Sequence, residues 1–123
     1  MKKMKKFFKS FYFAYYGIVE CFKTERNFKV HSISALAIFI CSFLFKISSI
    51  EWMFIIMSVV SVMTTEIINT AIEKTADFIE PNRNDTIRKI KDMTAGMVLI
   101  TAIGAFIIAC IIFIPKVLTI ICS

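Results

Sequence analysis

Residues that interrupt helices are scarce in this chain, which has three glycines and two prolines among 123 residues. The prolines are Pro81 and Pro115, and no repeat or low-complexity stretch occurs. Glycine and proline are the residues least favourable in a helix interior. Their scarcity therefore predicts a chain that is helical nearly throughout.

Cysteine patterns that form zinc sites or disulfide frameworks are also missing. The four cysteines are Cys21, Cys41, Cys110 and Cys122. No two of them form a CxxC pair, so we expect them to pack as small hydrophobic side chains. A cleavable signal peptide is not expected either, because Lys9 and Glu20 interrupt the first apolar stretch and no small-residue cleavage site follows it.

Apolar residues, by contrast, are abundant at 58% of the chain, and the mean hydropathy is +0.75. Soluble domains are about 45–50% apolar, and a chain this short has too small an interior to bury the excess. The net charge of +6 suits nucleic acid or an anionic membrane surface. Because the charges flank apolar runs, we expect the lipid bilayer as a partner and no nucleic acid.

The predicted fold class is an all-α membrane protein with a single domain over residues 1–123. Residues 4–27 carry one aromatic and one basic face, which is typical of an amphipathic helix lying in the membrane interface. Three runs are apolar enough to span the bilayer, namely residues 30–47, 52–71 and 93–114.

A polar segment over residues 73–92 joins the second and third spans, with a break at Pro81. Asp85 or Thr86 is expected to cap the helix that restarts there, and Pro115 to close the third span. Residues 1–30 hold eight Lys and Arg, and residues 73–92 hold five. By the positive-inside rule both segments are cytoplasmic, which predicts a multi-pass membrane protein.

An acidic stripe lies at one end of the second span and consists of Glu66, Asn69, Glu73 and Asp77. Their spacings of 3, 4 and 4 place them on one helical face. A carboxylate in the centre of a bilayer costs about 2.5–3.5 kcal/mol, so the stripe predicts a site for a divalent metal, for proton transfer or for both. A ladder of structural hydrogen bonds is the alternative.

The stripe, together with residues before the first and third spans, offers the groups that phosphoryl transfer needs. Magnesium takes one or two carboxylates, with water and phosphate as its other ligands, and a further carboxylate can accept the proton of an attacking hydroxyl. Lys91 and Asp92 precede the third span, and Glu25 precedes the first, so these groups converge at one depth. No Walker A or glycine-rich loop is present, and the residues alone leave the reaction type open.

Three segments resemble the prokaryotic diacylglycerol kinase family. Residues 66–77 (EIINTAIEKTAD) are similar to its signature, residues 91–96 (KDMTAG) to a second block, and residues 24–31 (TERNFKVH) to the block before the first span. The resemblance covers almost the whole chain. The stretches RNFKVH, FKTE and KISSIEW look more like the Gram-positive branch that phosphorylates undecaprenol.

The resemblance implies a homotrimer with active sites shared between subunits. It implies transfer of the γ-phosphate of ATP, with Mg²⁺, to the hydroxyl of a membrane lipid alcohol at the cytoplasmic face. Undecaprenol is the expected acceptor, and diacylglycerol, giving phosphatidic acid, is the alternative. A small ion- or proton-binding membrane subunit is an alternative of another class, against which the Lys91–Asp92 block argues.

The resemblance also assigns roles to residues. Glu66 matches the general base, and Glu25 and Glu73 match metal ligands. The implied nucleotide-binding residues are Lys6, Phe13, Asn69, Asp77, Asn82, Arg83, Asn84, Lys91 and Asp92. The implied lipid-substrate residues are Asn27, Phe28, Lys29, His31 and Glu66. Two positions depart from the diacylglycerol branch: Phe13 replaces a tyrosine, and His31 replaces an acidic residue and is expected to shape the lipid entrance.

Overall fold

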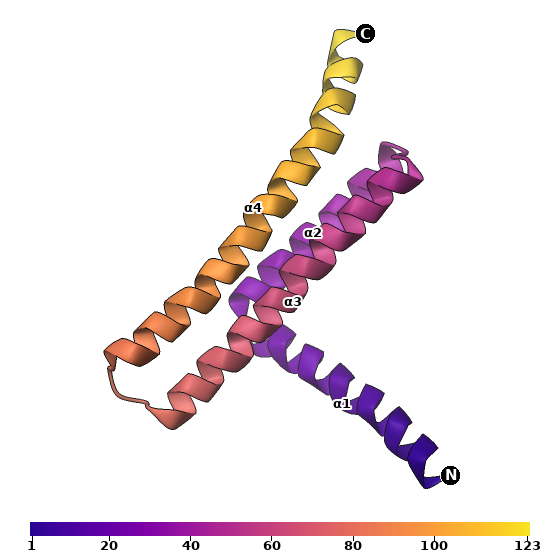
Figure 1. Cartoon of the computed structure of the whole chain (residues 1–123). Coiled ribbons are helices and arrows are strands. Elements are labelled where there is room, and N and C mark those ends of the chain that lie inside the picture. The colour runs from indigo at the N-terminus through magenta and orange to yellow at the C-terminus, as the bar shows by residue number, and fades with distance from the viewer.

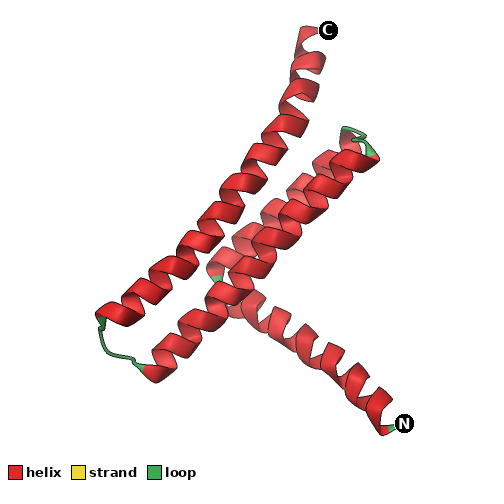
Figure 2. Ribbon diagram, viewed as in Figure 1, coloured by secondary structure: helices red, strands yellow, loops and turns green.

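Four helices and their short connections make up the whole chain in the computed structural model, which describes residues 1–123. The helices are α1 (Lys2–Thr24), α2 (Arg26–Leu44), α3 (Ser49–Ile79) and α4 (Asp85–Cys122). No strand is present (Figure 2). The prediction of a chain that is helical nearly throughout is confirmed.

Helix α3 is the centre of the arrangement. It packs against α2 on one side and along α4 on the other, whereas α2 and α4 do not approach each other closely. Helix α1 leaves the beginning of α2 at a steep angle and points away from the other three helices (Figure 1). The fold is therefore a bundle of three helices from which α1 projects.

Helices α2, α3 and α4 are long and apolar enough to span a membrane, with mean hydropathies of 1.5, 1.7 and 3.0 in their most apolar windows. At 1.5 Å per residue, the 31 residues of α3 extend about 46 Å. The hydrocarbon core of a bilayer is only about 30 Å thick. Because the polar residues of α3 are gathered after Glu66, its C-terminal end is the part that extends beyond the hydrocarbon.

Little of the apolar surface is covered by the chain itself, since only 11 of 123 residues are buried. The small hydrophobic core consists of Ile47, Ile55 and Ile112, close to the turn between α2 and α3. Most of the large apolar side chains on α2, α3 and α4 are exposed. In water this surface would be strongly unfavourable, so its place is against lipid or other membrane-embedded chains.

The turn between α2 and α3 is closed by polar contacts. Ser48 and Glu51 form a capping box, in which each side chain accepts the backbone N–H of the other. Glu51 also lies 3.1 Å from the Nζ of Lys116 near the end of α4. Lys46, within the turn, has a positive φ of 50°, a left-handed conformation that costs most side chains energy.

Two predicted helix ends are wrong. Asn84, not Asp85 or Thr86, caps α4, because its backbone is still extended and its Oδ1 accepts the N–H groups of Thr86 and Ile87. Pro115 does not close the last helix, which continues to Cys122. A proline removes one backbone donor, and helices in lipid tolerate this when other groups satisfy the freed backbone.

The first helix begins and ends earlier than predicted, at Lys2 and Thr24 and not at residues 4 and 27. It ends at Thr24, and Glu25 adopts an extended conformation (φ −109°, ψ 114°) before α2 begins at Arg26. This single extended residue produces the steep corner between α1 and α2 (Figure 1). Residues 26 and 27, predicted to continue the first helix, therefore belong to α2.

Candidate active site

The acidic stripe lies along one continuous helix, as its spacing predicted. Glu66, 2% exposed, and Asn69 are buried, Glu73 is half-buried, and Asp77 is exposed. Because α3 continues to Ile79, the stripe passes without a break from the interior of the bundle to its polar end. The stripe thus places carboxylates both in the interior of the bundle and at its exposed polar end.

Glu66 is paired across the bundle with a residue of α2. Nε2 of His31 lies 3.1 Å from Oε1 of Glu66, and the His31 side chain is 28% exposed. Sequence reasoning placed His31 with the lipid-substrate residues and missed this partner. A carboxylate taken out of water is costly unless it is paired or hydrogen-bonded, so the imidazole accounts for how Glu66 can be buried.

Asn69 and Glu73, the next two residues of the stripe, contact each other. Nδ2 of Asn69 donates to Oε1 of Glu73 over 3.4 Å, whereas Oδ1 of Asn69 is buried without any hydrogen-bond partner. Glu25, at the corner between α1 and α2, and Glu73 both lie within electrostatic range of Glu66. The two predicted metal ligands thus act on the predicted base through their charge.

These oxygen atoms fit some cations and not others. No group of three or more His, Cys, Asp or Glu side chains is arranged to hold a metal ion within one chain. That is insufficient for a closed structural zinc site, which needs four protein ligands. It is compatible with Mg²⁺, which takes one or two carboxylates and completes its shell with water and phosphate. The Oδ1 of Asn69, which has no hydrogen-bond partner, is a further oxygen atom at this place.

A polar pocket of about 450 Å³ lies between the end of α3, the connecting loop and the beginning of α4. Most of the predicted nucleotide-binding residues line it, namely Asp77, Asn82, Arg83, Asn84, Lys91 and Asp92. The Nζ of Lys91 forms a salt bridge with Asp77, and Arg88, which also lines the pocket, lies 3.3 Å from Asp92. The pocket thus offers three cationic side chains and two amides, together with three carboxylates, two of which pair with these cations.

Other predicted site residues lie elsewhere in the chain. Lys6 and Phe13 are on the exposed surface of α1, which points away from the polar pocket (Figure 1), and neither lines it. Phe28 is 3% exposed, so its ring packs inside the chain. Asn27 and Lys29 are exposed at the beginning of α2.

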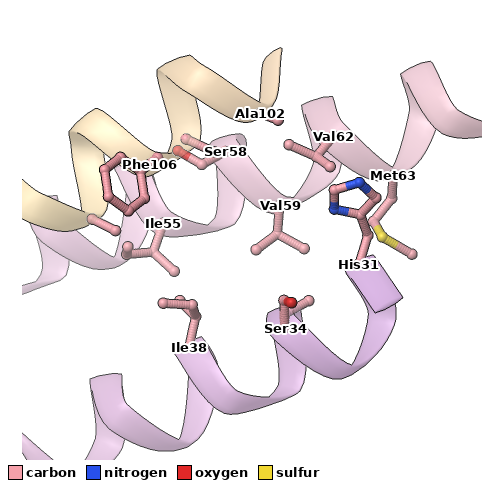
Figure 3. A pocket seen from close by; sticks show the side chains of 13 residues that line it. His31, Ser34, Ile38, Ile55, Ser58, Val59, Val62, Met63, Ala102 and Phe106 are labelled. Atoms are coloured by element: carbon pink, nitrogen blue, oxygen red, sulfur yellow. The ribbon is translucent and has the colours of Figure 1, made fainter. Parts of the chain in front are cut away.

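An apolar pocket of about 330 Å³ lies between α2, α3 and α4, and 10 of its 13 lining residues are hydrophobic. His31 is the only ionisable residue in its wall. Figure 3 shows the His31 ring at one end of the pocket, beside Met63, with Phe106 towards the other end. The imidazole therefore touches both the apolar pocket and Glu66.

Two polar contacts, which sequence reasoning also missed, hold the site helices together. Thr65 on α3 is the residue before Glu66, and its hydroxyl lies 3.0 Å from the hydroxyl of Thr101 on α4. Lys74 donates to the hydroxyl of Thr24 at the end of α1 over 3.4 Å. Each contact joins residues from different helices, and no local pattern signals such a pairing.

The fold and the site define a class of protein. This is a multi-pass α-helical membrane protein in which a buried carboxylate lies between an apolar pocket inside the bundle and a polar pocket at its end. Such a site can bring a membrane-embedded substrate to a water-soluble one.

The family follows from the sequence comparisons. Residues 12–113 match the sequence model described as "Prokaryotic diacylglycerol kinase", and the chain belongs to this family. The chain is 42% identical over 114 residues to an undecaprenol kinase of Bacillus subtilis, covering 93% of each protein. It is 32% identical over 111 residues to a diacylglycerol kinase of Synechocystis sp., covering 89% of this chain and 63% of that protein. The predicted family is confirmed, and the chain is a kinase with an alcohol as acceptor.

Proposed function

We propose that this protein transfers the γ-phosphate of ATP to the hydroxyl of undecaprenol, giving undecaprenyl phosphate and ADP. The observation that carries the proposal is the position of Glu66, a buried carboxylate whose partner His31 lines the apolar pocket, while its own helix leads to the polar pocket. The similarity to the Bacillus subtilis enzyme extends over 93% of both chains and supports this choice of acceptor.

Glu66 acts as the general base in this proposal. The lipid hydroxyl reaches Glu66 from the membrane, and its oxygen attacks the γ-phosphorus as the proton passes to the carboxylate. A new O–P bond forms, the bond between the γ-phosphorus and its bridging oxygen breaks, and ADP leaves with that oxygen. The chain contributes mainly by positioning two substrates from two phases.

The polar pocket holds the nucleotide. Lys91 is its central cation, and its salt bridge with Asp77 keeps the ammonium at the pocket when no phosphate is present. A Lys ammonium is a compact point charge that can turn from one anion to another. Asn82, Arg83 and Asn84 line the same pocket from the loop, where they surround the nucleotide.

Glu25 and Glu73 are the residues that would hold Mg²⁺, together with Oδ1 of Asn69, which has no partner in the chain. The metal, when bound, supplies positive charge that offsets the charge on the phosphoryl oxygens. Asn69 keeps Glu73 oriented through its Nδ2, whatever occupies the site.

The protein is proposed to lie in the bacterial plasma membrane with its acidic stripe at the cytoplasmic face. Helix α1 lies in the interface, since its aromatic and lysine side chains are all exposed. A homotrimer is proposed because most of the apolar surface is exposed. In such a trimer, Lys6 and Phe13 would contribute to the pocket of a neighbouring subunit.

Transfer of labelled phosphate from ATP, in detergent micelles with Mg²⁺, tests the proposal. Undecaprenol and diacylglycerol are offered in parallel at equal mole fraction, and Glu66→Gln is the matched inactive control. Preferential labelling of undecaprenol is expected. Preferential labelling of diacylglycerol would instead assign the activity named for the Synechocystis relative, and labelling of neither would reject the lipid-kinase reaction.

A further inference from the structure

The contact between His31 and Glu66 has no competitor within the chain. His31 is the only basic side chain within ion-pair distance of Glu66, and no other side chain forms a hydrogen bond with this carboxylate. A carboxylate has acceptors only. When Glu66 is ionised, Nε2 of His31 is therefore the atom that carries the hydrogen in this contact, in which Nε2 and Oε1 are 3.1 Å apart.

This pairing leaves the two oxygens of Glu66 in different situations. Oε1 is engaged by the imidazole, and Oε2 has no partner in the chain. A glutamate side chain has three rotatable bonds, and Glu25 and Glu73 act on it with like charge. Without the imidazole, the carboxylate would turn away from these charges, and its free oxygen would no longer have a defined direction.

The imidazole also has a defined place relative to the apolar pocket. It forms one end of that pocket (Figure 3), and its Nε2 lies 3.1 Å from Glu66, a residue of α3 that does not line the pocket. An alcohol whose apolar chain lies in the membrane beside α2, α3 and α4 meets the imidazole and the carboxylate as a unit.

We propose that His31 is a positioning residue for Glu66: its Nε2–H holds Oε1, so that Oε2 faces the lipid hydroxyl. This inference rests on the proposed function, in which Glu66 is the general base. It assigns His31 a role in the rate of proton transfer and not in the affinity for the lipid. Misplacement of a reacting group by about 1 Å can cost about 100-fold in rate.

Substitutions at position 31 that keep or remove the donor test the proposal. His31→Gln places an amide N–H close to the original Nε2, whereas His31→Leu removes the donor. His31→Asn keeps a polar amide, but its side chain is too short to reach Oε1. This variant replaces His31→Leu as the donor-free variant if the leucine protein does not fold. Ser32→Ala is the matched control, because its hydroxyl only bonds the carbonyl of Phe28.

The kinetic constants of the variants separate positioning from binding. His31→Leu and His31→Asn are expected to lower kcat about 10- to 100-fold, with KM for the lipid and for ATP changed less than about twofold. His31→Gln is expected to recover most of kcat, and Ser32→Ala to match the wild type. A His31→Leu or His31→Asn variant with wild-type kcat, or with a loss confined to KM for the lipid, would overturn the positioning role.

A double-mutant cycle gives the second readout. In the Glu66→Gln background, where no base remains to be positioned, His31→Leu should cause no further loss of the residual transfer. A loss that is fully additive would mean that His31 acts independently of Glu66, and the inference would be wrong. Glu66→Gln with normal turnover would reject the base assignment itself, together with the positioning role. An inactive Glu66→Gln beside a fully active His31→Leu rejects the positioning role alone.

Discussion

At one end of the bundle, which we call the closed end, Ile47, Ile55 and Ile112 are buried together. Trp52 stacks on Phe39 with ring centroids 6.1 Å apart, and the capping box and the Lys116 salt bridge satisfy the polar groups. The other end, which we call the acidic end, comprises the stripe from Glu66 to Asp77 and the polar pocket.

The acidic end, in contrast, leaves a polar group unpaired and is less tightly packed. It buries a carboxylate, leaves Oδ1 of Asn69 without a partner and contains the polar pocket, which is lined mostly by exposed residues. Proteins tolerate such unfavourable features mainly at functional sites and compensate for them elsewhere. The closed end is thus packed for stability, whereas the acidic end carries the charged groups and the polar pocket of the site.

The largest expected effect is the loss of activity when the charge of Glu66 is removed. Glu66→Gln keeps the shape of the side chain but cannot accept a proton as a carboxylate does, so we expect kcat to fall about 10²- to 10⁴-fold. Phosphate transfer measures the loss, and helicity by circular dichroism should stay unchanged. Glu51→Gln, the matched change at the closed end, should keep near-normal kcat; a similar loss there would erase the distinction between the ends.

The second effect concerns stability at the closed end. Ile112 is 6% exposed and, unlike Ile55, does not line the apolar pocket. Ile112→Ala leaves a cavity that costs about 2 kcal/mol, near the lower limit for such changes, because the unfolded helices are in lipid and not in water. Thermal denaturation in detergent should show the loss, while kcat below the transition stays normal. Ile56→Ala, at a position 47% exposed, is the control and should denature near the wild-type temperature.

A smaller effect is expected in the polar pocket. Lys91→Gln removes the cation that pairs with Asp77, and we expect KM for ATP to rise about tenfold, the equivalent of about 1.4 kcal/mol. Steady-state kinetics at saturating lipid measures the change. Lys89→Gln, an exposed neighbour that does not line the pocket, should leave KM unchanged. Equal effects of the two variants would indicate general attraction of ATP and not a defined site.

The smallest effect is a gain in stability at the turn of the closed end. Lys46 has a φ of 50°, which costs a side chain about 1–2 kcal/mol, whereas glycine adopts this conformation freely but loses more entropy on folding. Lys46→Gly should therefore stabilise the protein by about 0.5 kcal/mol. The denaturation temperature should rise slightly, and Lys46→Ala, which keeps the Cβ, should show no gain.

Much of this fold could be predicted from local patterns. Composition and hydropathy indicate three spanning helices, and the spacing of Glu66, Asn69, Glu73 and Asp77 places them on one face. These features depend on residues close together in the chain, and helical periodicity relates such residues directly. The errors at Asn84 and Pro115 were also local: the side chain that caps a helix, and whether a proline ends it, depend on alternatives of similar energy.

The sequence by itself determined that the chain is helical and membrane-spanning, and that it presents a stripe of carboxylates, because hydropathy and helical period act over short distances. Only the tertiary structure decided which groups meet. His31 and Glu66 come from different helices, and the burial of Asn69, the salt bridge of Lys91 with Asp77 and the two pockets all depend on how α2 and α4 pack against α3. Contacts between separate helices depend on crossing geometry, and no local pattern of residues encodes it.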